Sequence, residues 1–405
     1  MTIRLLVISE KYWPQGGGAE HATHLILGLL NRNNNDLKIT VLTGNNEPHR
    51  IDGVNFIYSK MLDTPTKIHL WRNLMTAGKL GFFNDLIRNN DITYIPRLSY
   101  PLIPLVKDLG KKVVVHLHDY QPITYCAGIF SKIRSDFKIG LLKDIKRSMA
   151  FEISEKRNLY KVLLSSSLTP TNGLVKLWIK HADKVICVSK RQCQIIKSAL
   201  PEIKNKFEVV YNPLPQIPLC KKKIGDPTFL YLGGDRYYKG FYLVLSAFSD
   251  MYKKYRNVKF LLAGGYNQEV KDTLTKINRK RNCLSIYERI NETEMLDLYS
   301  VSNALLFTSI LEEPLSYTVL ESMLTGTIPI VSRVGGVPEI VQGTFAERML
   351  YEPNNLEQIL DKAEYVLSLS KEQMFNINIG LRNSVLHRFN GEVINQQLSK
   401  IILDN

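Results

Sequence analysis

The sequence predicts an α/β protein of two similar domains that face each other across a cleft. The chain has 405 residues, which favours two domains over one. Apolar strand patterns alternate with helical patterns in both halves, as in doubly wound parallel sheets. A segment with three prolines, 212–218, separates the halves and is typical of a stiff linker. We therefore expect Rossmann-like domains at 1–215 and 216–385. A final helix, 386–405, is expected to pack back toward the first domain.

Continuous apolar runs predict strands that are buried on both faces of a parallel sheet. In the first half these runs are 3–9, 37–43, 54–58, 92–96, 112–117, 184–188 and 207–211. In the second half they are 228–232, 258–262, 283–287, 303–308, 328–332 and 348–351. Helical patterns lie between them, for example at 171–182 and 190–199, and the tail from 371 to 403 is predicted to be helical.

Composition excludes several classes of protein. The five cysteines include no C-x-x-C pair, so neither a disulfide framework nor a zinc knuckle is expected, and the reducing cytoplasm is the natural compartment. No apolar run reaches the ~18 residues that a membrane-spanning helix needs. Lys and Arg outnumber Asp and Glu by 53 to 38, which favours anionic partners without choosing among nucleotides, nucleic acid and an acidic membrane.

The segment 131–157 interrupts the alternation with a basic amphipathic pattern. Apolar residues recur every four positions from Ile133 to Met149, and six basic residues lie between 132 and 147. The pattern predicts a helix. One interpretation is an ordinary surface helix; the other is a contact with an anionic membrane or a lipid acceptor.

Ligands of open α/β sheets bind beyond the carboxyl ends of the strands, so the loops there are the candidate sites. The first such loop contains Gly16, Gly17 and Gly18, whose backbone can approach a phosphate closely or form a plain tight turn. The second contains His118, which ends a strand and is expected to face the cleft, whereas His116 is expected to point into the core.

Two further loops carry charge. The loop 233–240 combines glycines with Arg236 and Lys239 before a helix, which suits a diphosphate. In the loop after 303–308, Pro314 favours a helix start, so Glu313 is expected at the mouth of that helix and Glu321 within it. On one helix the two carboxylates would lie on the order of 12 Å apart. Hydrolytic pairs are roughly 5–9.5 Å apart, so a glycosidase is not indicated.

No metal site is expected, because D-x-D, H-E-x-x-H and clustered Cys or His are all absent from the sequence. A bound diphosphate would then depend on Arg236, Lys239 and helix dipoles for neutralisation.

In this order, the motifs resemble those of the retaining glycosyltransferases of family 4, which have the GT-B fold of two facing Rossmann-like domains. The resemblance covers nearly the whole chain. It rests on PQGGGAEHATHLILGLL, HLHDY, ADKVICVSK, VVYNP, YLGGDRYYKG, EMLDLYSVSNALLFTS, the E-x7-E pair Glu313 and Glu321, and VSRVGGVPEIV.

The resemblance implies a role for each matching position. Glu313 would contact the donor sugar, Glu321 the ribose hydroxyls, and Lys239 the diphosphate, which it would stabilise as the leaving group. The amides of Leu315 and Ser316 would meet the sugar or the phosphates. In the first domain, Gly17 and Gly18 would cap the phosphates or the acceptor, and His118 would bind the transferred sugar.

The sequence departs from the family pattern at two places. Gly233-Gly234 stands where Gly-Arg is usual, so Arg236 would have to replace the missing arginine. Pro314-Leu315-Ser316 stands where Gly-Phe-Gly is common, which removes one N–H donor.

The expected function is therefore a retaining, metal-independent transfer from a nucleoside diphosphate sugar to a glycan or lipid-linked hydroxyl, in the synthesis of a surface glycan or glycolipid. The expected location is the cytoplasm, with peripheral binding to an anionic membrane surface; no nucleic-acid partner and no cofactor are expected. Two alternatives stay open: a sugar-nucleotide epimerase of the same fold, and a non-catalytic nucleotide-binding protein.

Overall fold

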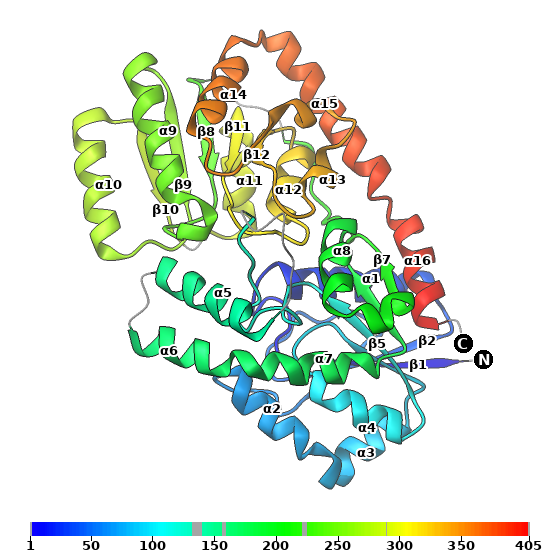
Figure 1. Cartoon of the computed structure of the whole chain (residues 1–405). Helices are drawn as coiled ribbons and strands as arrows, with labels where there is room; N and C mark the ends of the chain where they lie inside the picture. The colour runs from blue at the N-terminus through cyan, green and yellow to red at the C-terminus, as the bar shows by residue number, and fades with distance from the viewer. Residues whose placement is uncertain (1, 132–139, 156–158, 221–224, 289, 404–405) are drawn as a thin grey trace.

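The computed structural model describes residues 2–131, 140–155, 159–220, 225–288 and 290–403. It contains two α/β domains, each built on a parallel sheet with helices packed around it (Figure 1). This architecture confirms the predicted fold class.

The first sheet has seven strands in the order β3-β2-β1-β4-β5-β6-β7, all of them parallel. The strand order reverses between β1 and β4, which are direct neighbours. The strands are β1 (Ile3–Ser9), β2 (Leu37–Thr43), β3 (Asn55–Tyr58), β4 (Ile92–Ile95), β5 (Lys112–Leu117), β6 (Lys184–Cys187) and β7 (Phe207–Val209).

The second sheet has six parallel strands in the order β10-β9-β8-β11-β12-β13. Here the order reverses between β8 and β11. The strands are β8 (Thr228–Tyr231), β9 (Lys259–Ala263), β10 (Leu284–Tyr287), β11 (Ala304–Phe307), β12 (Ile328–Ser332) and β13 (Leu350–Tyr351).

Helices connect the strands, as crossovers between parallel neighbours require. Those of the first domain are α1 (Gly18–Asn33), α2 (Lys67–Met75), α3 (Gly81–Arg88), α4 (Ile103–Asp108), α5 (Leu141–Ser154), α6 (Leu159–Leu168), α7 (Asn172–Lys180) and α8 (Lys190–Ala199). Those that follow are α9 (Phe241–Lys254), α10 (Gln268–Arg281), α11 (Glu292–Val301), α12 (Tyr317–Leu324), α13 (Val337–Val341), α14 (Leu356–Ser368), α15 (Lys371–Arg388) and α16 (Gly391–Leu403).

Three details differ from the sequence predictions. The tail is two helices, because α15 ends at Arg388 and α16 begins at Gly391. The helix after Glu313 begins at Tyr317, three residues later than Pro314 suggested. Of the segment 131–157, residues 132–139, 156 and 157 lie outside the described residues, and the described helix α5 begins only after its N-cap Gly140.

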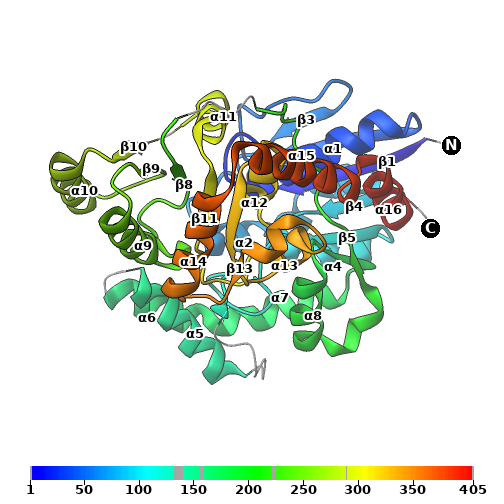
Figure 2. The same ribbon diagram turned by 90° about the horizontal axis from the view of Figure 1, so that it is seen from above.

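The C-terminal helix returns to the first domain, as predicted. Figure 2 shows α16 beside α1, and Asn34 at the end of α1 forms hydrogen bonds with Asn395 and Ser399 of α16. The domains also meet where the backbone after β5 lies beside the backbone after β11. There the Ser131 amide donates to the Ile310 carbonyl (2.8 Å), and the Glu312 amide donates to the Ile129 carbonyl (2.7 Å). None of the described helices is long and apolar enough to cross a membrane.

Candidate active site

The candidate site lies where the strand order of the second sheet reverses. Because β8 and β11 are parallel neighbours, the loops at their carboxyl ends leave the sheet side by side. The loop after β8 carries Lys239, and the loop after β11 carries Glu313. Side-chain and backbone hydrogen bonds join the two loops: the Thr308 hydroxyl donates to the Lys239 carbonyl (2.7 Å), and the Ile310 amide donates to the Tyr238 carbonyl (2.9 Å).

Lys239 and Glu313 form an ion pair between these two loops. Their Nζ and Oε1 atoms are 2.6 Å apart, and Ser309 donates a second hydrogen bond to the same oxygen (2.8 Å). Burial lowers the pKa of Lys239, but the charge of Glu313 and the hydrogen bond to it outweigh burial, so the pKa lies above its ordinary value. Lys239 therefore carries a positive charge throughout the physiological pH range.

The Gly335–Gly336 turn holds the backbone of Glu313 in place. Gly335 has φ of +50°, and a Cβ atom there would lie 1.8 Å from the Glu313 carbonyl oxygen. The Gly336 amide donates to that carbonyl (2.8 Å), and the Gly335 amide donates to the Glu312 carboxylate (2.8 Å). Glu312 is buried and forms an ion pair with Arg191 of the first domain (3.3 Å). The position of Glu313 is thus tied to both domains.

We expect Gly335→Ala to lower both stability and activity. A left-handed backbone costs an L-residue about 1–2 kcal/mol, and the added methyl would displace the Glu313 carbonyl. Urea unfolding measures the first effect, and a turnover assay measures the second. Gly380→Ala is the matched control, because Gly380 lies within α15 and a Cβ there would contact nothing within 4 Å. Equal activity in both variants would contradict the role given to this turn.

Unpaired backbone amides precede α12. Ser316 is its N-cap and accepts a hydrogen bond from the Val319 amide. Within the described part of the chain, the amides of Leu315 and Ser316 donate to no protein acceptor. Although Pro314 does not start the helix, these donors still lie at its positive end, close in sequence to Glu313. The arrangement suits an anion.

Glu321 lies inside α12 and is buried. Burial raises the pKa of its carboxyl to about 7, and the hydrogen bond from the Tyr299 hydroxyl (3.3 Å) opposes part of this rise. The carboxyl is therefore close to half-protonated at neutral pH. Glu313 precedes the helix, in line with its predicted place at the helix mouth, so the spacing of about 12 Å that one shared helix would give does not apply.

The glycine loop of the first domain approaches α12. A Cβ on Gly18 would lie 3.6 Å from the ring of Tyr317, the first residue of α12. The Gly17 amide donates to the Glu20 carboxylate (2.7 Å), and Glu20 is ion-paired with Arg97. A phosphate could take the Gly17 amide only by displacing Glu20, so the phosphate role of Gly17 stays a prediction.

His118 follows β5 on the first-domain side. Its ring stacks on that of His116 (centroids 4.4 Å apart), and its Nε2 atom is buried without a hydrogen-bond partner among the described residues. Burial and the charge of Arg97 lower the pKa of His118 to about 3, so the ring is neutral at pH 7. His116 is fully buried and bonds to Tyr94 (2.5 Å), which confirms its predicted place in the core.

Arg236 points to another partner. Its guanidinium is half-exposed and pairs with Glu155 just beyond α5 (3.3 Å). Next to this pair, the ring of Phe151 on α5 stacks on Tyr238, with centroids 5.5 Å apart. The loop that carries Lys239 is therefore braced by α5 of the first domain, and the structure does not bring Arg236 to the Lys239–Glu313 pair.

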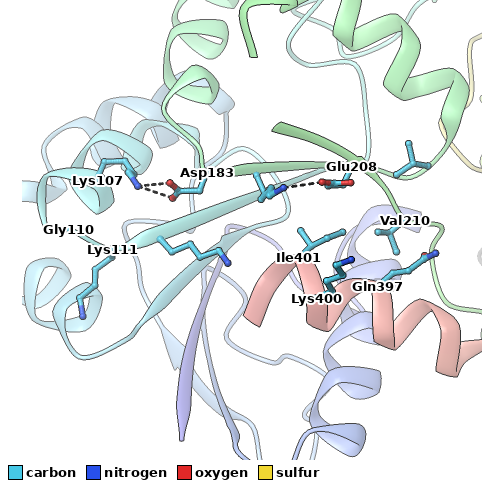
Figure 3. Close-up of a pocket in the computed structure, with 12 residues that line it drawn as sticks. Lys107, Gly110, Lys111, Asp183, Glu208, Val210, Gln397, Lys400 and Ile401 are labelled. Carbon is cyan, nitrogen blue, oxygen red and sulfur yellow. Dashed lines mark hydrogen bonds and ion pairs between the residues drawn. The ribbon is translucent and has the colours of Figure 1, made fainter. Parts of the chain in front are cut away.

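A separate hollow of about 820 Å³ lies beside the first sheet, next to α16 (Figure 3). It is bordered by the amino-terminal residues of β5 and β6, by β7 and by α16. Two ion pairs occupy part of its wall, Lys107–Asp183 and Lys184–Glu208. Because its lining includes neither Lys239 nor Glu313, we do not assign it to the active site.

Sequence reasoning missed several residues that shape the site. Glu312 is adjacent to the recognised Glu313, but only the structure shows that it faces Arg191 and Gly335. Tyr299 is separated from Glu321 by 22 positions, so no local pattern connects them. Ser309 could have been predicted from the sequence, because it follows a strand in the same loop as Glu313, at the carboxyl edge of the sheet where ligands bind.

Known proteins resemble this chain in sequence and in fold. Residues 220–379 match the family model of glycosyl transferases group 1. A subunit of phosphatidylinositol N-acetylglucosaminyltransferase from Arabidopsis thaliana is 21% identical over 389 residues, covering 92% of this chain and 77% of that protein. Sucrose-phosphate synthase from Thermosynechococcus elongatus has a TM-score of 0.73 at 16% identity and 98% coverage of both chains. Anabaena HepE in complex with UDP-glucose has a TM-score of 0.64 at 14% identity and full coverage of both chains.

The fold and the matched region define the class as a glycosyltransferase with the GT-B fold. The part of the chain that matches the group 1 family model, 220–379, carries Lys239, Glu313 and Glu321.

Proposed function

We propose that the protein transfers a sugar from a nucleoside diphosphate sugar to a hydroxyl group of a lipid-linked or glycan acceptor, with retention of anomeric configuration. The observation that carries this proposal is the Lys239–Glu313 ion pair beside the unpaired amides of Leu315 and Ser316. A cation and helix N-terminal donors suit a diphosphate, and a carboxylate suits the hydroxyls of a sugar.

In the proposed reaction, the bond between the anomeric carbon and the diphosphate oxygen breaks, and a bond to the acceptor oxygen forms on the same face of the sugar. The acceptor proton leaves with the diphosphate. Lys239 stabilises the charge that develops on the leaving group, which is the role a metal ion serves in other transferases. We therefore propose that the reaction is metal-independent. Glu321 binds the ribose, and His118, as a neutral ring, binds a hydroxyl of the transferred sugar.

A lipid-linked acceptor, and with it a role in glycolipid or surface-glycan synthesis, is supported by the relative named for phosphatidylinositol and by the basic character of the chain. We place the enzyme in the cytoplasm, at the inner face of an anionic membrane. The donor is a uridine diphosphate sugar in this proposal, since HepE binds UDP-glucose and the relative is named for N-acetylglucosamine.

Incubation with UDP-glucose or UDP-N-acetylglucosamine and phosphatidylinositol vesicles tests the proposal. We expect a glycolipid product whose anomeric proton shows the same configuration as the donor in NMR spectra, with undiminished yield when EDTA is present. Isomerised donor in the absence of acceptor would instead show an epimerase. Donor binding, seen as a raised melting temperature, without turnover on any lipid or glycan acceptor would show a non-catalytic binding protein.

A further inference from the structure

Helices α5, α6 and α7 expose large apolar side chains to the solvent, whereas soluble proteins bury most side chains of this kind. Seven of them are more than half exposed, and we call them the apolar face: Leu141, Leu142, Ile153, Leu159, Tyr160, Leu163 and Leu177. Figure 1 shows α5 lying alongside α6, with α7 following α6 along the first domain. Large exposed apolar side chains that gather on neighbouring helices are candidates for a site of interaction.

The inner side of α5 is polar, which reverses the usual pattern. Asp144 and Arg147 are buried and form an ion pair with each other (2.6 Å). Ser148 is also buried and accepts a hydrogen bond from Thr169 (3.1 Å). Arg147 is thus not an exposed basic residue of this helix, contrary to the expectation from its sequence. Since polar groups fill the space beneath α5, its exposed leucines are not displaced core residues.

The charges around the apolar face select a partner. Lys143, Lys146 and Lys161 are exposed, whereas α5, α6 and α7 have no exposed Asp or Glu among their described residues. Interfaces between proteins are depleted in lysine. Lysines beside leucines and a tyrosine are instead typical of helices that lie in the headgroup region of a membrane.

The apolar face adjoins the active site through α5. Phe151 and Glu155, near the end of that helix, contact Tyr238 and Arg236 in the loop that carries Lys239. A membrane bound here would therefore lie beside the loop that carries Lys239.

From these observations we propose that the apolar face inserts into the headgroup region of an anionic bilayer. This inference rests on the proposed function in one respect only: it explains how a lipid-linked acceptor stays in the membrane while its hydroxyl reaches Lys239 and Glu313. Insertion of side chains, rather than charge alone, predicts binding that persists in part at high salt, because salt screens the lysines and leaves the leucines unaffected.

Co-sedimentation of the full chain with vesicles tests the inference. We expect the wild type to bind vesicles of equal phosphatidylglycerol and phosphatidylcholine. The triple variant Leu159→Gln/Tyr160→Gln/Leu163→Gln should bind at least about tenfold more weakly at every salt concentration. The matched control replaces three exposed apolar residues of α15 and α16, Phe375→Gln/Leu386→Gln/Val393→Gln, and should bind like the wild type.

Other outcomes overturn the inference. Absence of wild-type binding, or equal loss in the two triple variants, would exclude this face as the membrane contact. A wild-type dimer that dissociates in the first variant, with no vesicle binding, would show that a second copy covers the face. The melting-temperature shift with UDP-glucose or UDP-N-acetylglucosamine is measured in parallel. Vesicle binding that depends on the face, without any donor shift, would support the inference while refuting the proposed donor.

Discussion

Lys239→Ala is expected to reduce kcat/KM for sugar transfer by about a hundredfold or more. Removing one preorganised electrostatic contact to a developing charge typically costs a reaction about that factor. The loss should appear in both kcat and donor affinity, since the ammonium would contact the diphosphate before and during departure. Steady-state kinetics measure the loss of kcat/KM, with the donor that raises the melting temperature as the substrate. Lys253→Ala is the control, because Lys253 is largely exposed and pairs with Asp250 one helical turn away.

Glu313→Gln tests the other half of the ion pair. The amide keeps the size of the side chain and the hydrogen bond from Ser309, but it removes the charge that Lys239 faces at 2.6 Å. We expect a similar loss of kcat, with the fold unchanged in circular dichroism spectra. Activity within tenfold of the wild type in both Lys239→Ala and Glu313→Gln would exclude this pair as the catalytic centre.

The pair also has a role before the donor binds. Each member neutralises the other at the domain junction, so neither charge is left unpaired in a partly buried site. A bound diphosphate would compete with Glu313 for Lys239 and would free the carboxylate for the sugar hydroxyls. The strength of donor binding then depends on the exchange of one anionic partner for another, and not on the full attraction between Lys239 and the phosphates.

The sequence was sufficient for the fold because the relevant signals are local. Runs such as Ile3–Ser9 and Lys112–Leu117 are largely apolar, and both strands have the predicted bounds. The same runs identify the loops at the carboxyl ends of strands, which is why Lys239 and Glu313 could be proposed as site residues from the sequence alone. Ser316 shows the limit of such signals: a proline suggested one helix start, whereas the side-chain cap determined another.

What the sequence could not provide are contacts between distant segments. Arg191 and Glu312 are 121 positions apart and meet because the domains do. On α5, the periodicity that suggested a basic outer face was correct about the helix and wrong about Arg147, because a nearby carboxylate, Asp144, allowed the arginine to be buried. Helical periodicity gives the faces of a helix, but which face turns inward depends on what packs against it.

Glu321→Gln is expected to stabilise the protein at alkaline pH. Burial raises the pKa of Glu321 from 4.5 to about 7, despite the hydrogen bond from Tyr299, and the charge of Glu292 contributes to the rise. The folded state therefore holds a proton that the unfolded state has lost between pH 4.5 and 7. Stability conferred by this group is greatest below pH 4.5 and falls as the pH rises through that window, by about 3 kcal/mol in all.

The variant lacks this titration, so its free energy of unfolding should exceed that of the wild type increasingly from pH 5 to pH 8. Urea unfolding at several pH values measures the difference, with Glu357→Gln on the exposed side of α14 as the control. Donor affinity should change in the opposite direction, because an ionised carboxylate accepts two ribose hydroxyl bonds and an amide oxygen accepts them more weakly. A variant that is less stable at pH 8, or that binds the donor as well as the wild type, would contradict the assignment. A charge buried at this position destabilises the protein unless a ligand compensates for its burial. The ribose of the proposed donor would supply that compensation, and this accounts for a glutamate that destabilises the empty protein.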